Sequence, residues 1–84
     1  MEIEIHHDKE NQRVWTEKDS FIAEVQYTCA DGTLDILHTY VPEQLEGQGI
    51  ASKLVEFVYK YALNQGLKIT ATCPYARIWL KRHQ

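Results

Sequence analysis

Two glycines, Gly47 and Gly49, lie where the pattern of the chain changes from strand to helix. They belong to the stretch 44–49, which follows Pro42 and precedes an apolar repeat of helical period. Glycine adopts positive φ and lets the backbone approach an anion closely, and the unpaired N–H groups of a first helical turn favour a phosphate. Lys53, one turn into the helix, adds positive charge. This spacing indicates a phosphate-binding loop, although two glycines also serve simply to turn a chain.

A cysteine and a histidine are candidates for nucleophilic and acid–base chemistry. Cys73 precedes Pro74, which suits the first position of a helix, and a helix N-terminus favours a thiolate. His38 lies within an expected strand, and imidazole is a suitable base near neutral pH. Each residue also has a structural interpretation: Cys73 as a small buried apolar side chain, and His38 as a strand residue with a satisfied ring.

Other polar residues are weaker candidates. His6 and His7 are adjacent in an expected strand, so they point to opposite faces and do not act together. The cysteines and histidines lack metal-ligand spacing, so no metal site is expected. Tyr75, in the first turn of the last helix, could donate a proton. Three basic residues further along that helix either reach a phosphate or are simply solvated: Arg77, Lys81 and Arg82.

The elements that must position these residues follow from periodicity. Strands are expected at residues 3–6, 13–16, 21–28 and 34–41, and after a long helix at 67–72. Asp31-Gly32 predicts a tight hairpin, and Gly66 a helix end. A last helix begins at Pro74, and Trp15 and Trp79 are expected in the core. The order predicts an α+β fold: a mostly antiparallel sheet with a central strand–helix–strand unit and two helices.

The glycine loop also carries a resemblance. Gln44-x-x-Gly47-x-Gly49, followed by Ile50-Ala51, resembles the Gln/Arg-x-x-Gly-x-Gly/Ala signature of the GCN5-related N-acetyltransferases. The stretch 38–54, together with residues 73–75, is similar to the short, single-domain members of that superfamily. The resemblance covers about residues 20–83. It implies a minimal fold of this family, as one domain over residues 1–84.

The resemblance implies acetyl-coenzyme A as co-substrate, with its pyrophosphate on the loop amides and its pantetheine arm along the preceding strand. The implied coenzyme-binding residues are Tyr40, Val41, Gln44, Gly47, Gln48, Gly49, Ile50, Ala51, Ser52, Lys53 and Tyr75. Cys73 and His38 match active-site candidates of the short members. Arg77, Lys81 and Arg82 could then reach the adenosine 3′-phosphate.

The predicted function is acetyl transfer to an unidentified amine, on a small molecule or a protein. The chain is too short for the N-terminal helix pair and the C-terminal strands that shape the acceptor pocket in full-length members. A non-catalytic coenzyme A-binding or sensing module is therefore an alternative. A nucleic-acid-binding domain is disfavoured, because the chain is acidic overall and lacks a basic stripe interleaved with aromatic residues.

Composition limits these functions further. The chain has 84 residues, 44% of them hydrophobic, which suits one small globular domain that acts as a monomer. It has no run of ~20 apolar residues and no signal-peptide pattern at its start, so the cytoplasm is the expected location. Cys29 and Cys73 are then expected as free thiols, with a single disulfide as the alternative.

Charge is divided unevenly along the chain. Residues 1–47 carry a formal charge of −8 and residues 48–84 a charge of +5, which together give −3. The basic half is suited to an anionic ligand, and the acidic half to a cationic one. Alternatively, the two halves simply attract each other on the surface.

Overall fold

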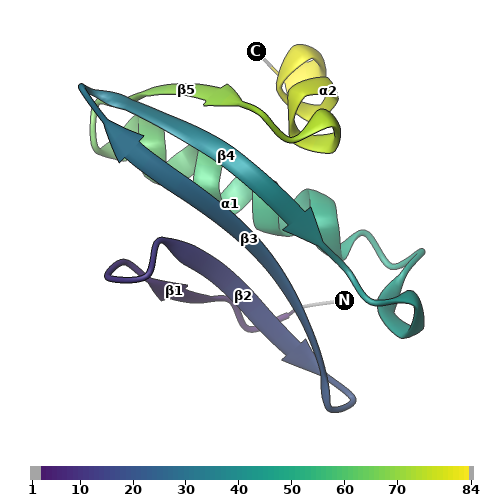
Figure 1. Cartoon of the computed structure of the whole chain (residues 1–84). Coiled ribbons are helices and arrows are strands. Elements are labelled where there is room, and N and C mark those ends of the chain that lie inside the picture. The colour runs from purple at the N-terminus through teal and green to yellow at the C-terminus, as the bar shows by residue number, and fades with distance from the viewer. Residues whose placement is uncertain (1–2, 84) are drawn as a thin grey trace.

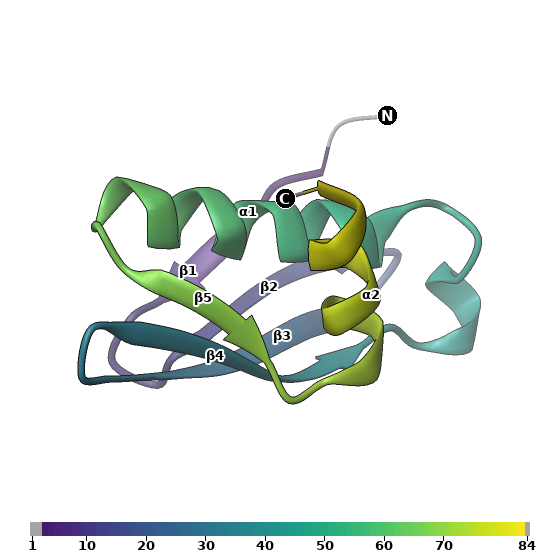
Figure 2. The same cartoon turned by 90° about the horizontal axis from the view of Figure 1, so that it is seen from above.

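The computed structural model describes residues 3–83 as a five-stranded sheet with two helices. The elements are β1 (His6–Asp8), β2 (Arg13–Lys18), β3 (Phe21–Ala30), β4 (Thr33–Tyr40), the short 3₁₀ helix η1 (Glu43–Leu45), α1 (Ile50–Asn64), β5 (Lys68–Ala71) and α2 (Pro74–His83). The strands lie side by side in chain order, and only β4 and β5 pair in parallel (Figure 1). Both helices lie on one face of the sheet (Figure 2). The expected α+β fold with a central strand–helix–strand unit is confirmed.

Two tight turns join the middle strands. Asp31 and Gly32 both have positive φ, 54° and 77°, as a type I′ hairpin turn requires, and this confirms the expected hairpin. The turn between β2 and β3 is built in the same way from Asp19 and Ser20, with φ of 53° and 70°. This second turn contains no glycine, so the sequence gives no strong hairpin signal at this position.

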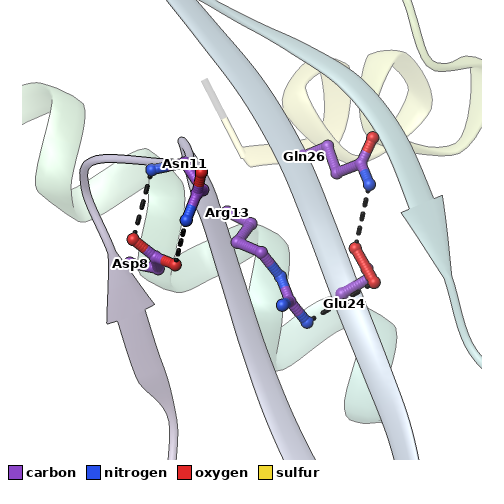
Figure 3. A network of polar contacts seen from close by, with 5 residues as sticks. All are labelled: Asp8, Asn11, Arg13, Glu24 and Gln26. Carbon is purple, nitrogen blue, oxygen red and sulfur yellow. Dashed lines mark hydrogen bonds and ion pairs between the residues drawn. The ribbon is translucent and has the colours of Figure 1, made fainter.

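The first strand lies later than its alternating pattern predicts. The expected strand at residues 3–6 is wrong, since β1 begins at His6 and Ile3 and Ile5 precede it. The Asp8 carboxylate accepts hydrogen bonds from the backbone N–H of Asn11 at 3.1 Å and from its side-chain amide at 2.9 Å (Figure 3). These bonds fix the turn after Asp8 and so place the paired residues immediately before it.

The core lies between the sheet and the two helices. Helix α1 buries five residues at helical spacing: Ile50, Leu54, Val55, Val58 and Ala62. Trp79 of α2 is 6% exposed, and its Nε1 donates to Ser52 Oγ at 2.9 Å, which ties α2 to α1. The expectation that Trp15 is a core residue is wrong. It alternates with the buried Val14 and Thr16, so it lies on the open face of the sheet, stacked on His6.

Strand β4 contains a bulge that shapes one end of the sheet. Gln26 pairs with His38 and Tyr27 with Ile36, so Leu37 has no partner on β3. Pairing between β4 and β5 ends at the same place, with Ile36 opposite Ala71. Beyond it β4 runs on to Tyr40, whereas the chain after β5 turns into α2. The two parallel strands therefore part here, and the last residues of β4 have no strand on that side.

His7 lies on the helix-covered face, opposite to His6. Its Nε2 is 2.5 Å from the Tyr27 hydroxyl, and its ring meets Tyr61 edge-on at 4.5 Å. Burial lowers the pKa of His7, and Lys9 lowers it further. Burial also raises the pKa of Tyr27 to about 12. The fold therefore favours a neutral imidazole at this position.

Protonation of His7 is expected to destabilise the fold. The pKa of His7 is lower in the folded chain than its ordinary value of 6.5, so its stabilising contribution is complete above that value. It is lost as the pH falls from 6.5 through the lowered pKa. The melting temperature should fall more steeply from pH 7.5 to pH 5 in the wild type than in His7→Gln, followed by circular dichroism. His6→Gln, which alters the other face, is the control, and parallel wild-type and His7→Gln profiles would contradict the prediction.

Candidate functional site

A cavity of about 410 Å³ opens where β4 and β5 part. Its wall comes from four segments: the end of β4, η1 with the loop after it, the first turn of α1 and the first turn of α2. The lining residues are Thr39, Val41, Leu45, Glu46, Gly47, Gly49, Ile50, Ala51, Ser52 and Tyr75. The parting of the strands thus brings the glycine loop beside the chain segment that holds Cys73.

The glycine loop presents backbone N–H groups to this cavity. Gly47 and Gly49 have φ of 79° and 76°, and a Cβ atom at either would meet nothing within 4 Å. Gly49 is the N-cap of α1, where no side chain caps the helix and no acidic residue lies in the first turn. An α-helix leaves its first N–H groups, here those of Ile50, Ala51 and Ser52, without a partner in the helix. The loop therefore offers hydrogen-bond donors at the positive end of a 15-residue helix.

The cavity wall brings together seven of the expected coenzyme-binding residues. They are Val41, Gly47, Gly49, Ile50, Ala51, Ser52 and Tyr75. It also includes three residues that sequence reasoning missed. Thr39 follows the strand alternation that leads to Val41, and this alternation could have identified it. Leu45, which is 1% exposed, and Glu46 belong to a 3₁₀ turn that the sequence did not reveal.

Four expected residues lie outside the cavity wall. Tyr40 is half-exposed and pairs with Glu24. Gln44 is an exposed residue of η1, and Lys53 lines a separate hollow beside Ile3 and Ile5. Gln48 lies in the loop itself, and its side chain forms a hydrogen bond with a residue far away in the sequence.

That residue is Lys18, at the end of β2. Its ammonium group donates to Gln48 Oε1, so the turn between β2 and β3 touches the glycine loop. Lys18 places a positive charge beside the loop, where Glu46 contributes a negative one to the cavity wall. Thirty residues separate Lys18 from Gln48, and no local sequence pattern signals such a contact.

Cys73 lies just behind the cavity wall. It is 7% exposed, and its Sγ is 3.5 Å from Oγ1 of Thr39. Its carbonyl accepts a hydrogen bond from the N–H of Arg77, so Cys73 is at the N-cap of α2, as expected. Burial raises the pKa of this thiol, but hydrogen bonds from the Thr39 hydroxyl and from the amides of Ala76 and Tyr75 lower it further than burial raises it. The net pKa is lowered, which favours the thiolate.

His38 lies on the face of β4 that points away from the cavity. It is exposed and pairs with the exposed Gln26, whereas its neighbour Thr39 pairs with the buried Val25. His38 does not line the cavity, so the structure does not bring it together with Cys73 there.

A polar network covers the sheet face next to His38. Glu24 accepts from Gln26 Nε2 at 3.0 Å and forms an ion pair with Arg13 at 3.5 Å (Figure 3). The Glu24 side chain is 21% exposed and held on both sides. It is therefore suited to orienting its neighbours.

Several other features of the described chain bear on the site. Cys29 and Cys73 are both free thiols, as expected. Within residues 3–83, no three His, Cys, Asp or Glu side chains gather closely enough to hold a metal ion. Neither helix in this part of the chain has the length and apolar character needed to cross a membrane.

A family model described as GCN5-related N-acetyl-transferase matches residues 4–84. The chain belongs to the GCN5-related N-acetyltransferase family. Its fold is also similar to the solution structure of a GCN5-like protein from Staphylococcus aureus, with a TM-score of 0.76 and 31% identity, over 95% of this chain and 79% of that one. The resemblance drawn from residues 38–54 and 73–75 is confirmed at the level of the family.

One curated relative is similar to part of the chain. Protein NATD1 of Xenopus tropicalis is 33% identical over 51 residues, which are 61% of this chain and 47% of that protein. The match thus spans about half the length of this relative.

Proposed function

We propose that the chain is an N-acetyltransferase that binds acetyl-coenzyme A in the cavity and transfers its acetyl group to an amine. The observation that carries the proposal is the uncapped start of α1, preceded by two left-handed glycines and open to a cavity of about 410 Å³. Such a helix start is suited to a pyrophosphate. Family membership supports the same activity.

The residues present fit this co-substrate. The amides of the loop and of the first turn of α1 would hold the pyrophosphate, with Lys18 as a nearby cation. The end of β4, with Thr39 and Val41 in the cavity wall, would lie along the pantetheine arm. We assign a supporting role in coenzyme binding to four further residues that do not line the cavity. They are Gln44 and Gln48 in the loop region, Lys53 in α1 and Tyr40 in β4.

The chemistry requires an activated acyl group, which the bound thioester supplies. In the proposed route, the Cys73 thiolate forms a bond to the acetyl carbon as the carbon–sulfur bond to the coenzyme breaks. Tyr75, which lines the cavity, gives its proton to the departing sulfur. The amine then displaces the Cys73 sulfur and releases its proton to water in the cavity. His38, which lies on the open face of the sheet, is the proposed base that takes up this proton from solvent. His38 returns this proton to Tyr75 through solvent.

Titration with acetyl-coenzyme A and with coenzyme A tests the binding. Saturable shifts are expected for the amide signals of residues 47–53, because those N–H groups would gain phosphate acceptors. Turnover is then measured on a panel of amines by release of the free thiol. Absence of any shift would refute the proposal. Saturable shifts without turnover on any amine would favour the alternative, a non-catalytic coenzyme A-binding or sensing module.

Incubation with acetyl-coenzyme A is expected to leave one acetyl group on Cys73, detected by mass spectrometry. Cys73→Ala should lose this species, and turnover should fall by about 100-fold or more, because the route loses its nucleophile. Cys29→Ala is the matched control and should keep both. His38→Gln should keep the acetylation and slow only the second step. Unchanged turnover in Cys73→Ala would mean that the amine attacks the thioester directly and that Cys73 only lines the acyl pocket.

We further propose that the protein is a monomer and that it is located in a reducing compartment such as the cytoplasm. The two free thiols, Cys29 and Cys73, support the reducing compartment.

A further inference from the structure

A pair of side-chain hydrogen bonds joins β4 to the chain after β5 at the point where the strands part. The Asp35 carboxylate accepts from the backbone N–H of Thr72 through Oδ1 and from the Thr72 hydroxyl through Oδ2, both at 2.8 Å. Beside it, the Ile36 carbonyl accepts from the N–H groups of Thr72 and Cys73, at 2.9 and 3.0 Å. The pair Asp35–Thr72 thus forms a clamp directly before Cys73.

The clamp and the Cys73 sulfur lie on opposite faces of the sheet. Asp35 alternates with the buried Leu34 and Ile36, so its side chain lies on the open face, and it does not line the cavity. Cys73 is buried behind the cavity wall. The carboxylate is therefore connected to the sulfur through the backbone of residues 72 and 73, and it can act by holding that backbone in place.

The same stretch of backbone is also held from the side of α2. Arg77 Nε donates to the Ala71 carbonyl at 3.3 Å, and the Arg77 N–H donates to the Cys73 carbonyl at 2.9 Å. The chain turns into α2 directly after this stretch, whereas β4 runs on past it (Figure 1). The clamp is therefore a side-chain link that ties the start of α2 back to β4.

The sulfur of Cys73 lies beside the gap between the diverging strands. Its Sγ is 3.5 Å from Oγ1 of Thr39, in the last part of β4. Thr39 and Cys73 both follow the last pair that joins β4 to β5, which is Ile36 with Ala71. The distance between them consequently depends on how firmly the two strands are joined at the base of the gap, where the clamp lies.

We propose that Asp35 is a positioning residue for Cys73, and that its clamp on Thr72 keeps the sulfur beside Thr39 and in line with the acyl group. The inference rests on the proposed function, which makes Cys73 the nucleophile. Charge-assisted hydrogen bonds such as those of the clamp are the stronger ones in proteins. Without them, residues 72 and 73 move away from β4 and the thiolate loses the Thr39 hydroxyl.

Loss of the clamp should change the reactivity of Cys73 and leave coenzyme binding in place. The hydrogen bond with Thr39 lowers the pKa of the Cys73 thiol, so its loss raises that pKa and leaves less thiolate at neutral pH. A displaced sulfur also attacks the acyl carbon more slowly. The glycine loop belongs to another segment, so the affinity for coenzyme A should not change.

Alkylation of Cys73 by iodoacetamide across a range of pH tests the clamp without any coenzyme, in a Cys29→Ala background so that only one thiol reacts. Asp35→Asn removes the charge but keeps both bonds, because an amide oxygen accepts from the Thr72 N–H and an amide nitrogen donates to the hydroxyl oxygen. Asp35→Ala removes the same charge and both bonds. Alkylation at pH 7 should be about 5-fold slower in Asp35→Ala than in Asp35→Asn, since about one hydrogen bond to the thiolate is lost.

Two further comparisons separate positioning from general destabilisation. Thr72→Val removes the hydroxyl bond alone and should slow alkylation less than Asp35→Ala, whereas Thr72→Ser should react like the wild type. Asp8→Ala is the matched control. Asp8 also accepts two bonds from one residue, Asn11, in the turn after β1, so its loss should leave the alkylation profile unchanged.

Equal profiles in Asp35→Ala and Asp35→Asn, or an equal slowing in Asp8→Ala, would overturn the inference. If Asp35→Ala does not fold, Thr72→Val and Thr72→Ser decide, and equal profiles in those two overturn it as well. With acetyl-coenzyme A, acetylation of Cys73 should be slower in Asp35→Ala than in Asp35→Asn. If the wild type never gains an acetyl group, the proposed route fails, and alkylation still decides whether Asp35 positions the sulfur.

Discussion

Replacing Gly49 with valine is expected to raise the dissociation constant for acetyl-coenzyme A by about 100-fold, because hydrogen bonds from backbone N–H groups to the pyrophosphate are lost. Gly49 has a φ of 76°, a conformation that a β-branched residue avoids. Relaxing this φ should rotate the peptide between Gly49 and Ile50, which should turn the Ile50 N–H away from the phosphate and disturb the start of the first turn. Isothermal titration calorimetry measures the change.

Gly32→Val is the matched control for this variant. Gly32 has nearly the same φ, 77°, but lies in the turn between β3 and β4, away from the cavity. Both substitutions should lower the free energy of unfolding by roughly 1–2 kcal/mol. Only Gly49→Val should weaken binding, and an equal loss of affinity in Gly32→Val would point to general destabilisation.

Leu54→Ala is expected to lower the free energy of unfolding by about 3 kcal/mol, the cost of a cavity at a fully buried leucine. Leu54 is 0% exposed and lies on the stripe of α1 that packs on the sheet. Small domains have only about 5–15 kcal/mol of stability, so this variant should lose a large share. Urea denaturation followed by circular dichroism measures the loss.

Leu63→Ala, in the same helix, serves as the comparison for Leu54→Ala. Leu63 is 56% exposed, so its truncation should change the free energy of unfolding by less than about 0.5 kcal/mol. Similar losses in both variants would mean that the α1 stripe does not form the core as described.

The sequence predicted those parts of the fold that depend on local patterns. The apolar spacing of α1, the Asp31-Gly32 turn and the Gly66 stop all depend on a few neighbouring residues. Gly49 could be recognised for the same reason, since a glycine before a helix is a local signal.

Other features depend on pairing between distant residues and could not be predicted in this way. The bulge at Leu37 follows from the register of β4 against β3. The face on which Trp15 lies depends on how β2 pairs with β3, where Val14 lies opposite the buried Val25 and Trp15 lies opposite Glu24. The Lys18–Gln48 contact arises only when the turn after β2 meets the loop before α1.

The sequential order of the strands has a consequence for how the chain folds. Strands β2, β3 and β4 each pair with the strand before them, so these strands can form as consecutive hairpins while later residues are still unfolded. The cavity draws on β4, α1 and α2, so it exists only after the last helix has docked. A ligand held there binds the completed fold alone and stabilises it against every partly folded form. Ligand binding would therefore occur only in chains that have completed the last step of folding.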